Sequence, residues 1–266
     1  MQSLLDSNPW NLDPGCIPIS WRKDIAALPT RKLKLAIVYD DGVVRPQPPV
    51  MRAMREVARK LMDDGHEVTE WDTTFHNRGI PHWTKSVLAD CGHHCRQLCS
   101  LIDEPLIQGM IVGTATDELP TIERESLEEE KYAFAQAYLS QWKDAGIDAL
   151  LLPFTPWVGY RPKEWVRSSQ WLGYTAVFNL LDYAGVTVPV TRADGGLDCP
   201  NSRSEGMREW VVHWERIRNE ADRFNWGQYD IDSVKGMPVT VQIVGGRFGE
   251  EKAISVAKVI DGLFGR

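Results

Sequence analysis

The sequence predicts an α/β fold, a partial mixed β-sheet with helices on both faces. Apolar runs of strand length alternate with segments in which apolar residues recur at helical spacing. Near the amino terminus a strand, a helix and a second strand follow one another, which indicates a βαβ unit with a parallel strand pair. With 266 residues, 43% of them apolar, the chain can bury one large core. We therefore interpret residues 1–266 as a single domain with an insertion at 193–225.

The amino-terminal third carries the βαβ unit. Residues 1–32 are rich in proline, so we expect them to be irregular or wrapped around another surface. "KLKLAIVYDDG" predicts a buried strand that ends in a turn. "PPVMRAMREVARKLMDDGH" predicts a helix, because its apolar residues recur at helical spacing between two prolines and Gly65. "HEVTEWD" predicts the second strand.

The rest of the chain continues the alternation. Residues 83–103 and 119–144 predict two helices, and "DALLLPFTP" predicts a strand. "YTAVFNLLDYAG" predicts a buried helix, and "VTVPVT" a strand that pairs on one side only at Pro189. The polar stretch 192–232 contains an amphipathic piece, "EGMREWVVHWERIRNEADRF", and forms the expected insertion. "MPVTVQIVG" and a final helix complete the sequence.

Composition narrows the class of function. The net charge is −7 and basic residues are scattered, which argues against a nucleic-acid partner. No run approaches the roughly 18 apolar residues of a membrane span, and no secretory signal is recognisable. Five cysteines, an odd count, favour a reduced cytoplasmic setting. We expect a protein that handles a small molecule.

The stretch "VTVQIVGGRFGEEKAISVAKVI" has the outline of a phosphate-binding turn. A dinucleotide site needs a second strand after the helix, and here the helix after Gly249 runs to the last residue. Glu250 and Glu251 also lie in the first helical turn, where they would repel a phosphate. We interpret the stretch as a tight connection between a strand and a helix, and we expect no cofactor.

The segment "CGHHCRQLC" resembles a metal cluster in composition. On one helix, Cys91 and Cys99 would lie about 12 Å apart at 1.5 Å per residue. Zinc requires its sulfur ligands about 2.3 Å from one centre. We therefore expect buried free cysteines and no metal site.

No nucleophile motif stands out. The pattern G-x-S-x-G is absent, and Ser168 and Ser169 have no flanking glycines that could bring backbone N–H groups around an oxyanion. The pattern S-x-x-K occurs in three unrelated contexts, at Ser20/Lys23, Ser140/Lys143 and Ser255/Lys258. We assign no catalytic residue.

Four blocks taken in order resemble the amidase-signature hydrolases, especially the fungal acetamidase-like branch. They are "NPWNLDP", "KLKLAIVYDDGVVRPQPPVMRAMREVARKLMDDGHEVTEW", "DALLLPFTP" with "YTAVFNLLDYAGVTVPVT", and "GMPVTVQIVGGRFGEEKAISVAKVI". The resemblance covers residues 8–192 and 226–264 and corresponds to the carboxyl-terminal half of that domain. It implies an incomplete amidase domain and, as activity, hydrolysis of a carboxamide to a carboxylic acid and ammonia.

In this family, two serines and a lysine that carry the chemistry precede the "PW" block, which here begins at residue 8. The resemblance thus implies that the chain lacks the Ser-Ser-Lys segment and is a truncated, inactive pseudoenzyme on its own. Three alternatives stay open. The chain could be a non-catalytic module that self-associates or docks a protein through an uncovered sheet face. It could be one half of a two-chain amidase, or an enzyme built on Ser168 and Ser169 or on its histidines.

The resemblance also suggests where a small amide would bind. "FTPWVGY" and "YTAVFNLLDY" are expected to face the substrate pocket of the full-length family, and from them we select Trp157, Tyr174 and Asn179 as substrate-binding candidates. Packing of these side chains between helix and sheet is the alternative.

Overall fold

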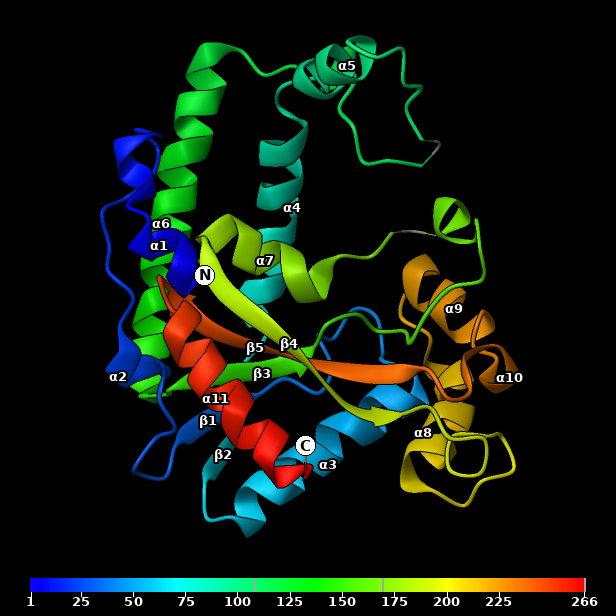
Figure 1. Cartoon of the computed structure of the whole chain (residues 1–266). Coiled ribbons are helices and arrows are strands. Elements are labelled where there is room, and N and C mark those ends of the chain that lie inside the picture. The colour runs from blue at the N-terminus through cyan, green and yellow to red at the C-terminus, as the bar shows by residue number, and fades with distance from the viewer. Residues whose placement is uncertain (108, 169, 266) are drawn as a thin grey trace.

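The computed structural model describes residues 1–107, 109–168 and 170–265. Five strands form one mixed sheet in the order β2-β1-β3-β5-β4 (Figure 1). The strands are β1 (Lys34–Ile37), β2 (Glu67–Glu70), β3 (Ala149–Pro153), β4 (Tyr183–Arg192) and β5 (Pro238–Arg247). All five predicted strands are confirmed, and so is the α/β fold class.

Helices cover both faces of this sheet, as the sequence predicted (Figure 1). The helices are α1 (Gln2–Asp6), α2 (Lys23–Ala26), α3 (Pro48–Asp63), α4 (Thr74–Leu88), α5 (His93–Ser100), α6 (Thr121–Ala145), α7 (Gly173–Leu181), α8 (Glu205–His213), α9 (Glu220–Gly227), α10 (Ile231–Val234) and α11 (Glu250–Leu263). None of the helices in the described ranges is long and apolar enough to span a lipid bilayer.

Strand directions define two edges of the sheet. β1 runs parallel to both β2 and β3, which confirms the predicted βαβ unit. β5 runs antiparallel to β3 and to β4. The loops that follow β1 and β3 therefore leave from the same end of the strands. We call this end of the sheet the carboxyl edge. β5 ends and β4 begins at the opposite edge, the amino edge.

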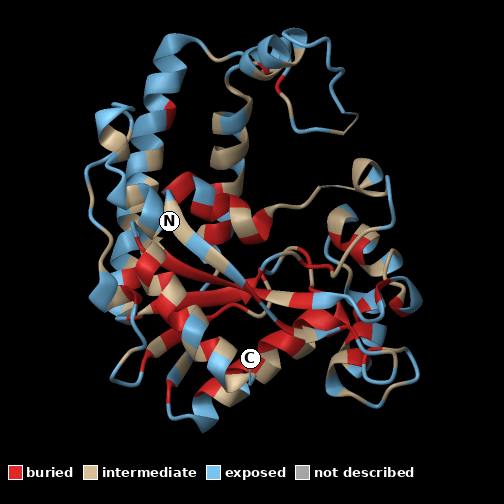
Figure 2. Cartoon of the chain, viewed as in Figure 1, coloured by how far each residue is buried: buried red, intermediate tan, exposed pale blue. Residues whose placement is uncertain are grey.

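Side chains of neighbouring strand residues enter two different cores, because successive residues of a strand point to opposite faces. Leu35 and Leu151 pack with α3 and α11 in one core. Leu150 and Leu152 pack with α6 and α7 in the other. Figure 2 shows the buried residues concentrated in the sheet and in the helix surfaces that face it. The continuous apolar runs of β1 and β3 are thus explained by burial on both sides.

The predicted helix over 83–103 is wrong in both bounds. α4 begins at Thr74, includes Pro81, and ends at Leu88. Cys91 and Gly92 then adopt positive φ angles of 58° and 68°, which interrupt a right-handed helix. The Asp90 Oδ1 accepts a hydrogen bond from the Gly92 N–H at 2.7 Å, and this local turn replaces a helical turn. α5 is consequently a separate helix.

Two further boundaries differ from the prediction. Asp182 has a φ of 56° and ends α7, so β4 begins at Tyr183, earlier than the "VTVPVT" run suggested. The amphipathic piece of the expected insertion forms two helices, α8 and α9, separated by the 3₁₀ turn Trp214–Arg216. β4 is the last strand in the sheet order and pairs with β5, as expected from Pro189.

Residues 22–27 lie along α11, so this part of the segment that was predicted to be irregular or wrapped around another surface does lie against one. The Ser255 hydroxyl donates to the Ala27 carbonyl oxygen at 2.6 Å, and the Lys258 ammonium donates to the Ala26 carbonyl oxygen at 2.7 Å. The carboxylate of Glu251, only 3% exposed, accepts hydrogen bonds from the guanidinium and the backbone N–H of Arg22.

The glycine stretch is a tight connection between β5 and α11, as predicted. A Cβ atom on Gly245 would collide with the carbonyl oxygen of Gly249, and a Cβ atom on Gly249 would collide with that of Gly245. Gly246 adopts a φ of 88°, which L-residues rarely tolerate. The glycines are therefore required by close approach of two backbone segments.

Candidate functional site

Two loops meet at the carboxyl edge because β1 and β3 are adjacent and parallel. Residues 38–47 follow β1, and residues 154–172 follow β3. The backbone N–H of Gln47 donates to the Pro156 carbonyl oxygen at 2.7 Å. The Val158 N–H donates to the Gln47 Oε1 at 3.3 Å, and the Gln47 side chain is buried. Ligands of α/β sheets typically bind outside the carboxyl ends of strands.

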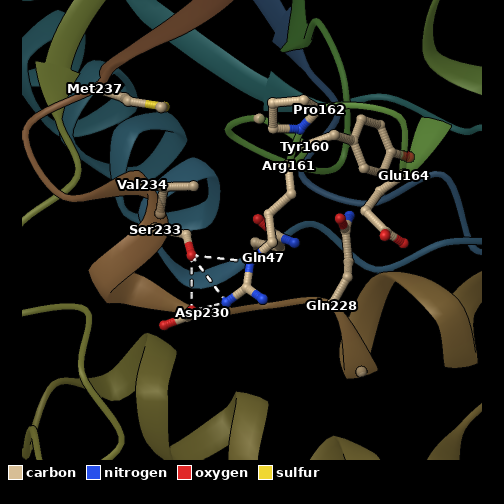
Figure 3. Close-up of a pocket in the computed structure, with 12 residues that line it drawn as sticks. Gln47, Tyr160, Arg161, Pro162, Glu164, Gln228, Asp230, Ser233, Val234 and Met237 are labelled. Carbon is tan, nitrogen blue, oxygen red and sulfur yellow. Dashed lines mark hydrogen bonds and ion pairs between the residues drawn. The ribbon is translucent and has the colours of Figure 1, made fainter.

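A cavity of about 490 Å³ lies beside this junction (Figure 3). Its walls come from the loop after β3, from Gln47, and from the region of α9 and α10. The lining residues are Gln47, Gly159, Tyr160, Arg161, Pro162, Glu164, Gly227, Gln228, Asp230, Ser233, Val234 and Met237. The volume is that of a small-molecule site.

One wall of the cavity carries a charged triplet. Arg161 Nη2 contacts Asp230 Oδ2 at 2.5 Å, and the Ser233 hydroxyl donates to the same carboxylate at 2.7 Å. Arg161 also donates to Ser233 Oγ from Nε and Nη2, at 3.2 and 3.1 Å. The hydrogen bond from Ser233 and the guanidinium of Arg161 lower the pKa of Asp230. The Arg161 guanidinium is thus held in place on this wall, and the Asp230 carboxylate balances its charge.

Tyr160, which lines the cavity, belongs to a cluster of aromatic rings. The Trp157 and Tyr160 ring centroids lie 4.5 Å apart, and Trp165 lies 5.8 Å from Trp157 and 5.5 Å from Tyr160. The Tyr160 hydroxyl is buried without a hydrogen-bond partner among the residues described. Burial raises the pKa of Tyr160, an effect that neighbouring Ser168 partly opposes. The phenol therefore remains protonated.

Asp41 organises the first loop from within. Its Oδ1 accepts from the N–H groups of Val43 and Val44, at 2.8 and 2.9 Å, and its Oδ2 accepts from the Trp171 indole at 2.7 Å. The Tyr174 hydroxyl accepts from the Asp41 N–H at 3.1 Å and donates to the Val44 carbonyl at 2.8 Å. Burial raises the pKa of Asp41 to about 6, even though these donors favour the carboxylate.

The segment around α8 and α9 clamps the same loop. Asp222 is fully buried and accepts from the Arg45 N–H at 2.9 Å, the Arg218 N–H at 3.1 Å and His213 Nε2 at 2.8 Å. The Arg218 guanidinium binds both carboxylate oxygens of Asp40, at 2.7 and 2.9 Å. Burial lowers the pKa of His213, and Asp222 partly offsets this effect. The expected insertion therefore holds one loop of the candidate site.

The structure places the three substrate-binding candidates differently. Trp157 does not line the 490 Å³ cavity, but its ring packs at an angle of 49° against Tyr160, which does, and it lines another cavity of about 220 Å³. Tyr174 is buried and supports the first loop through its hydroxyl. Asn179 is exposed on α7. Two of the three therefore adjoin the carboxyl edge, and their role in substrate binding stays a prediction.

Tyr160 lies at the end of the stretch "FTPWVGY" that was expected to face the pocket, but sequence reasoning missed most of the cavity lining, above all Gln47, Arg161 and Gln228. Each lies in a connection or a short helix, where residue periodicity carries no information. The available signal was topological: the loops that follow two adjacent parallel strands meet at one edge.

Serines of the candidate motifs make hydrogen bonds to the backbone, and none that the structure describes is paired with a lysine base. The hydroxyls of Ser140 and Ser168 donate to the backbone carbonyls of Gln136 and Trp165. Ser169 lies outside the described residues. Within the described part of the chain, no serine hydroxyl is hydrogen-bonded to a lysine, and no cluster of His, Cys, Asp and Glu could hold a metal ion.

All five cysteines are free and half-buried, so the prediction of free thiols is confirmed but that of full burial is wrong. α5 carries Cys95 and Cys99 and has no buried residue, because it projects away from the sheet (Figure 1).

Comparison with known proteins identifies the class. The Amidase family profile matches residues 1–254, and the chain belongs to this family. It is similar to Amidase 1 of Gibberella moniliformis, with 32% identity over 98% of this chain and 49% of that protein. It is also similar to the acetamidase of Aspergillus oryzae, with 28% identity over 100% of this chain and 48% of that protein.

A solved structure agrees on the fold. Fatty acid amide hydrolase superposes with a TM-score of 0.82 at 24% identity, over 98% of this chain and 44% of that one. The chain spans about half the length of the curated relatives it matches.

Proposed function

We propose that this chain forms the substrate-binding half of a carboxamide hydrolase, which converts an amide to a carboxylic acid and ammonia. The cavity at the carboxyl edge carries this proposal, because it joins the loops after β1 and β3 and is lined by amide and hydroxyl groups beside one guanidinium and the carboxylates of Glu164 and Asp230. Family membership supplies the reaction class.

The cavity offers the hydrogen-bonding groups that a primary amide needs. A carboxamide has one carbonyl acceptor and an NH₂ group with two donors. The Gln228 Nε2 donates to Asn225 Oδ1 at 3.3 Å, which leaves the Gln228 Oε1 as an acceptor for a ligand NH₂ group. Arg161 binds Asp230 through Nη2, which leaves Nη1 as a donor for a ligand carbonyl. Both residues line the same cavity (Figure 3).

We propose further that hydrolysis requires a nucleophile and a base supplied by a segment outside these 266 residues. In the described ranges, Ser168, Ser233 and Ser255 donate their hydroxyl hydrogens to carbonyl or carboxylate oxygens. A serine nucleophile needs a base within hydrogen-bond reach. The half-length match to the curated amidases supports the same division of labour.

The test measures ammonia release from acetamide and larger primary amides. We expect no turnover by the purified chain alone. We expect turnover when it is mixed with the segment of Amidase 1 of Gibberella moniliformis that this chain does not match. Gln228→Leu should weaken the reconstituted activity about tenfold by removing one polar contact, whereas Gln97→Leu on exposed α5 should not.

Two results would contradict the proposal. Ammonia released by the chain alone and abolished in Ser168→Ala would place the nucleophile within it. Reconstituted turnover that is indifferent to Gln228→Leu and to Arg161→Gln would remove the cavity from substrate binding.

A further inference from the structure

A second hollow lies at the amino edge of the sheet, opposite the candidate site. It measures about 460 Å³ and is bounded by α6, the end of α7, the start of β4 and the glycine-containing end of β5. The lining residues are Tyr132, Ala135, Gln136, Leu139, Trp142, Leu181, Tyr183, Gly245, Gly246 and Arg247. We call it the amino-edge groove.

The walls of the groove are largely apolar and open to solvent. Leu139 on α6 is 43% exposed and Tyr132, two helical turns earlier, is 67% exposed. At the base, the Trp142 and Tyr183 rings meet edge to face with centroids 5.6 Å apart. The two glycines keep the floor free of side chains. Apolar surface that is gathered in a concave site favours an apolar ligand.

One charged side chain lines the groove, that of Arg247. Its Nε lies 3.4 Å from Asp182 Oδ2, and the two side chains are 61% and 75% exposed, so this pair is weak. The guanidinium also lies over the Phe248 ring, 5.2 Å from its centroid. A cation with donors to spare is thus held at the rim of an apolar hollow.

We propose that the amino-edge groove binds a carboxylate that carries an alkyl chain. The chain lies against Leu139, Trp142 and Leu181, and the carboxylate accepts two hydrogen bonds from the Arg247 guanidinium in place of Asp182. Guanidinium and carboxylate match in planar, two-point geometry. Because the groove and the candidate amide site lie at opposite edges, this inference is independent of the proposed function.

Calorimetric titration with hexanoate, octanoate and decanoate tests whether the alkyl chain lies in the groove. Each added methylene should tighten binding about fourfold while it remains inside the groove, from the free energy of burying one CH₂ group. Leu139→Ser should flatten this series. Leu139 is largely outside the core, so the variant should fold, which circular dichroism checks.

Charge variants test the polar part. Arg247→Gln should weaken octanoate binding about tenfold, since a charge-assisted hydrogen-bond pair is lost. Asp182→Asn should tighten it a few-fold by removing the competing carboxylate, and asparagine tolerates the positive φ at this position. Arg203→Gln, an exposed arginine elsewhere, is the matched control and should leave the affinity unchanged.

Four outcomes overturn the inference. They are an affinity that does not grow with chain length, equal binding of octanoate and octanol, an unchanged affinity in Arg247→Gln, and the absence of saturable binding by any of the three carboxylates. Amide turnover in the reconstitution described above is read separately, so the two proposals fail or survive apart.

Discussion

The long helices α4 and α6 pack aromatic rings over the sheet, whereas the short helices α8, α9 and α10 bury polar groups at its carboxyl edge. The rings of Trp71, Phe75, Phe134, Tyr138 and Trp142 form the first region, which we call the aromatic layer. In the second region, which we call the polar edge, His213, Asp222 and Asn225 are buried and hydrogen-bonded.

The two regions also differ in how their helices begin. Ser204, Asn219 and Asp230 cap α8, α9 and α10 through side-chain hydrogen bonds. α4 and α6 begin without a side-chain cap. A side-chain cap contributes proportionally more to a short helix than to a long, well-packed one, although the short helices α5 and α7 also begin without a side-chain cap. We therefore expect replacing a large side chain by alanine to lower the free energy of unfolding most in the aromatic layer. At the polar edge we expect the loss of single hydrogen bonds to lower it.

The largest effect should come from Tyr138→Ala in the aromatic layer. Tyr138 is fully buried and contacts Trp71, Phe75 and Phe134. Removing its ring should lower the free energy of unfolding by about 4 kcal/mol, as is typical of aromatic-to-alanine changes in a core. Urea titration followed by circular dichroism measures the loss. Tyr132→Ala, on the same helix but 67% exposed, is the control and should cost under about 0.5 kcal/mol. Similar losses in both variants would refute the comparison.

Two buried groups, His76 beside the aromatic layer and Asp41 in the first loop of the site, should make the stability respond to pH with opposite signs. Burial lowers the pKa of His76, in the aromatic layer, to about 4. From pH 6.5 down to 4 the unfolded chain binds the proton that the folded chain rejects, so stability falls as the solution is acidified. Burial raises the pKa of Asp41, in the first loop of the site, to about 6. Between pH 3.8 and 6 the folded chain holds the extra proton, so stability falls as pH rises.

Each group changes the free energy of unfolding by on the order of 3 kcal/mol, and the two changes largely cancel between pH 4 and 6. A variant that removes one group should reveal the effect of the other. Relative to the unchanged protein, His76→Phe should make unfolding free energy fall more steeply with rising pH in this window, and Asp41→Asn should make it rise. Urea titrations at several pH values measure both slopes. Parallel slopes in all three proteins would show that neither group titrates as described.

The smallest effect concerns a helix cap at the polar edge. Asn219 Oδ1 accepts from the Asp222 N–H at 3.0 Å, and its Nδ2 donates to the Val43 carbonyl at 2.9 Å. Asn219→Ala should cost about 1 kcal/mol and speed amide hydrogen exchange at Arg45, whose N–H depends on Asp222. Asn201→Ala, in an exposed turn, should change neither. Loss of stability without faster exchange at Arg45 would show that the cap does not support the loop.

The comparison also separates what sequence could and could not predict. β1 and β3 were predictable because burial on both faces demands a continuous apolar run. The break between α4 and α5 was not, since it depends on the backbone conformation of Cys91 and on an Asp90 turn. Arg45 and Asp222 lie 177 positions apart, and no periodicity relates them. Trp157 and Tyr174 were selected through family resemblance and adjoin the carboxyl edge, where their role in substrate binding stays a prediction, whereas Gln47 and Arg161 emerge only from the fold.

The sheet order has a consequence for how the protein is made. Of the five described strands β5 is synthesised last, yet it sits between β3 and β4. The first three strands can pair with one another before residue 238 is synthesised, but β4 cannot pair until β5, its only strand neighbour in the described sheet, has also been made. In a nascent chain that ends before residue 238, β4 would therefore have no strand to pair with. An unpaired strand is prone to aggregation, so this is the stage at which the chain depends most on chaperones.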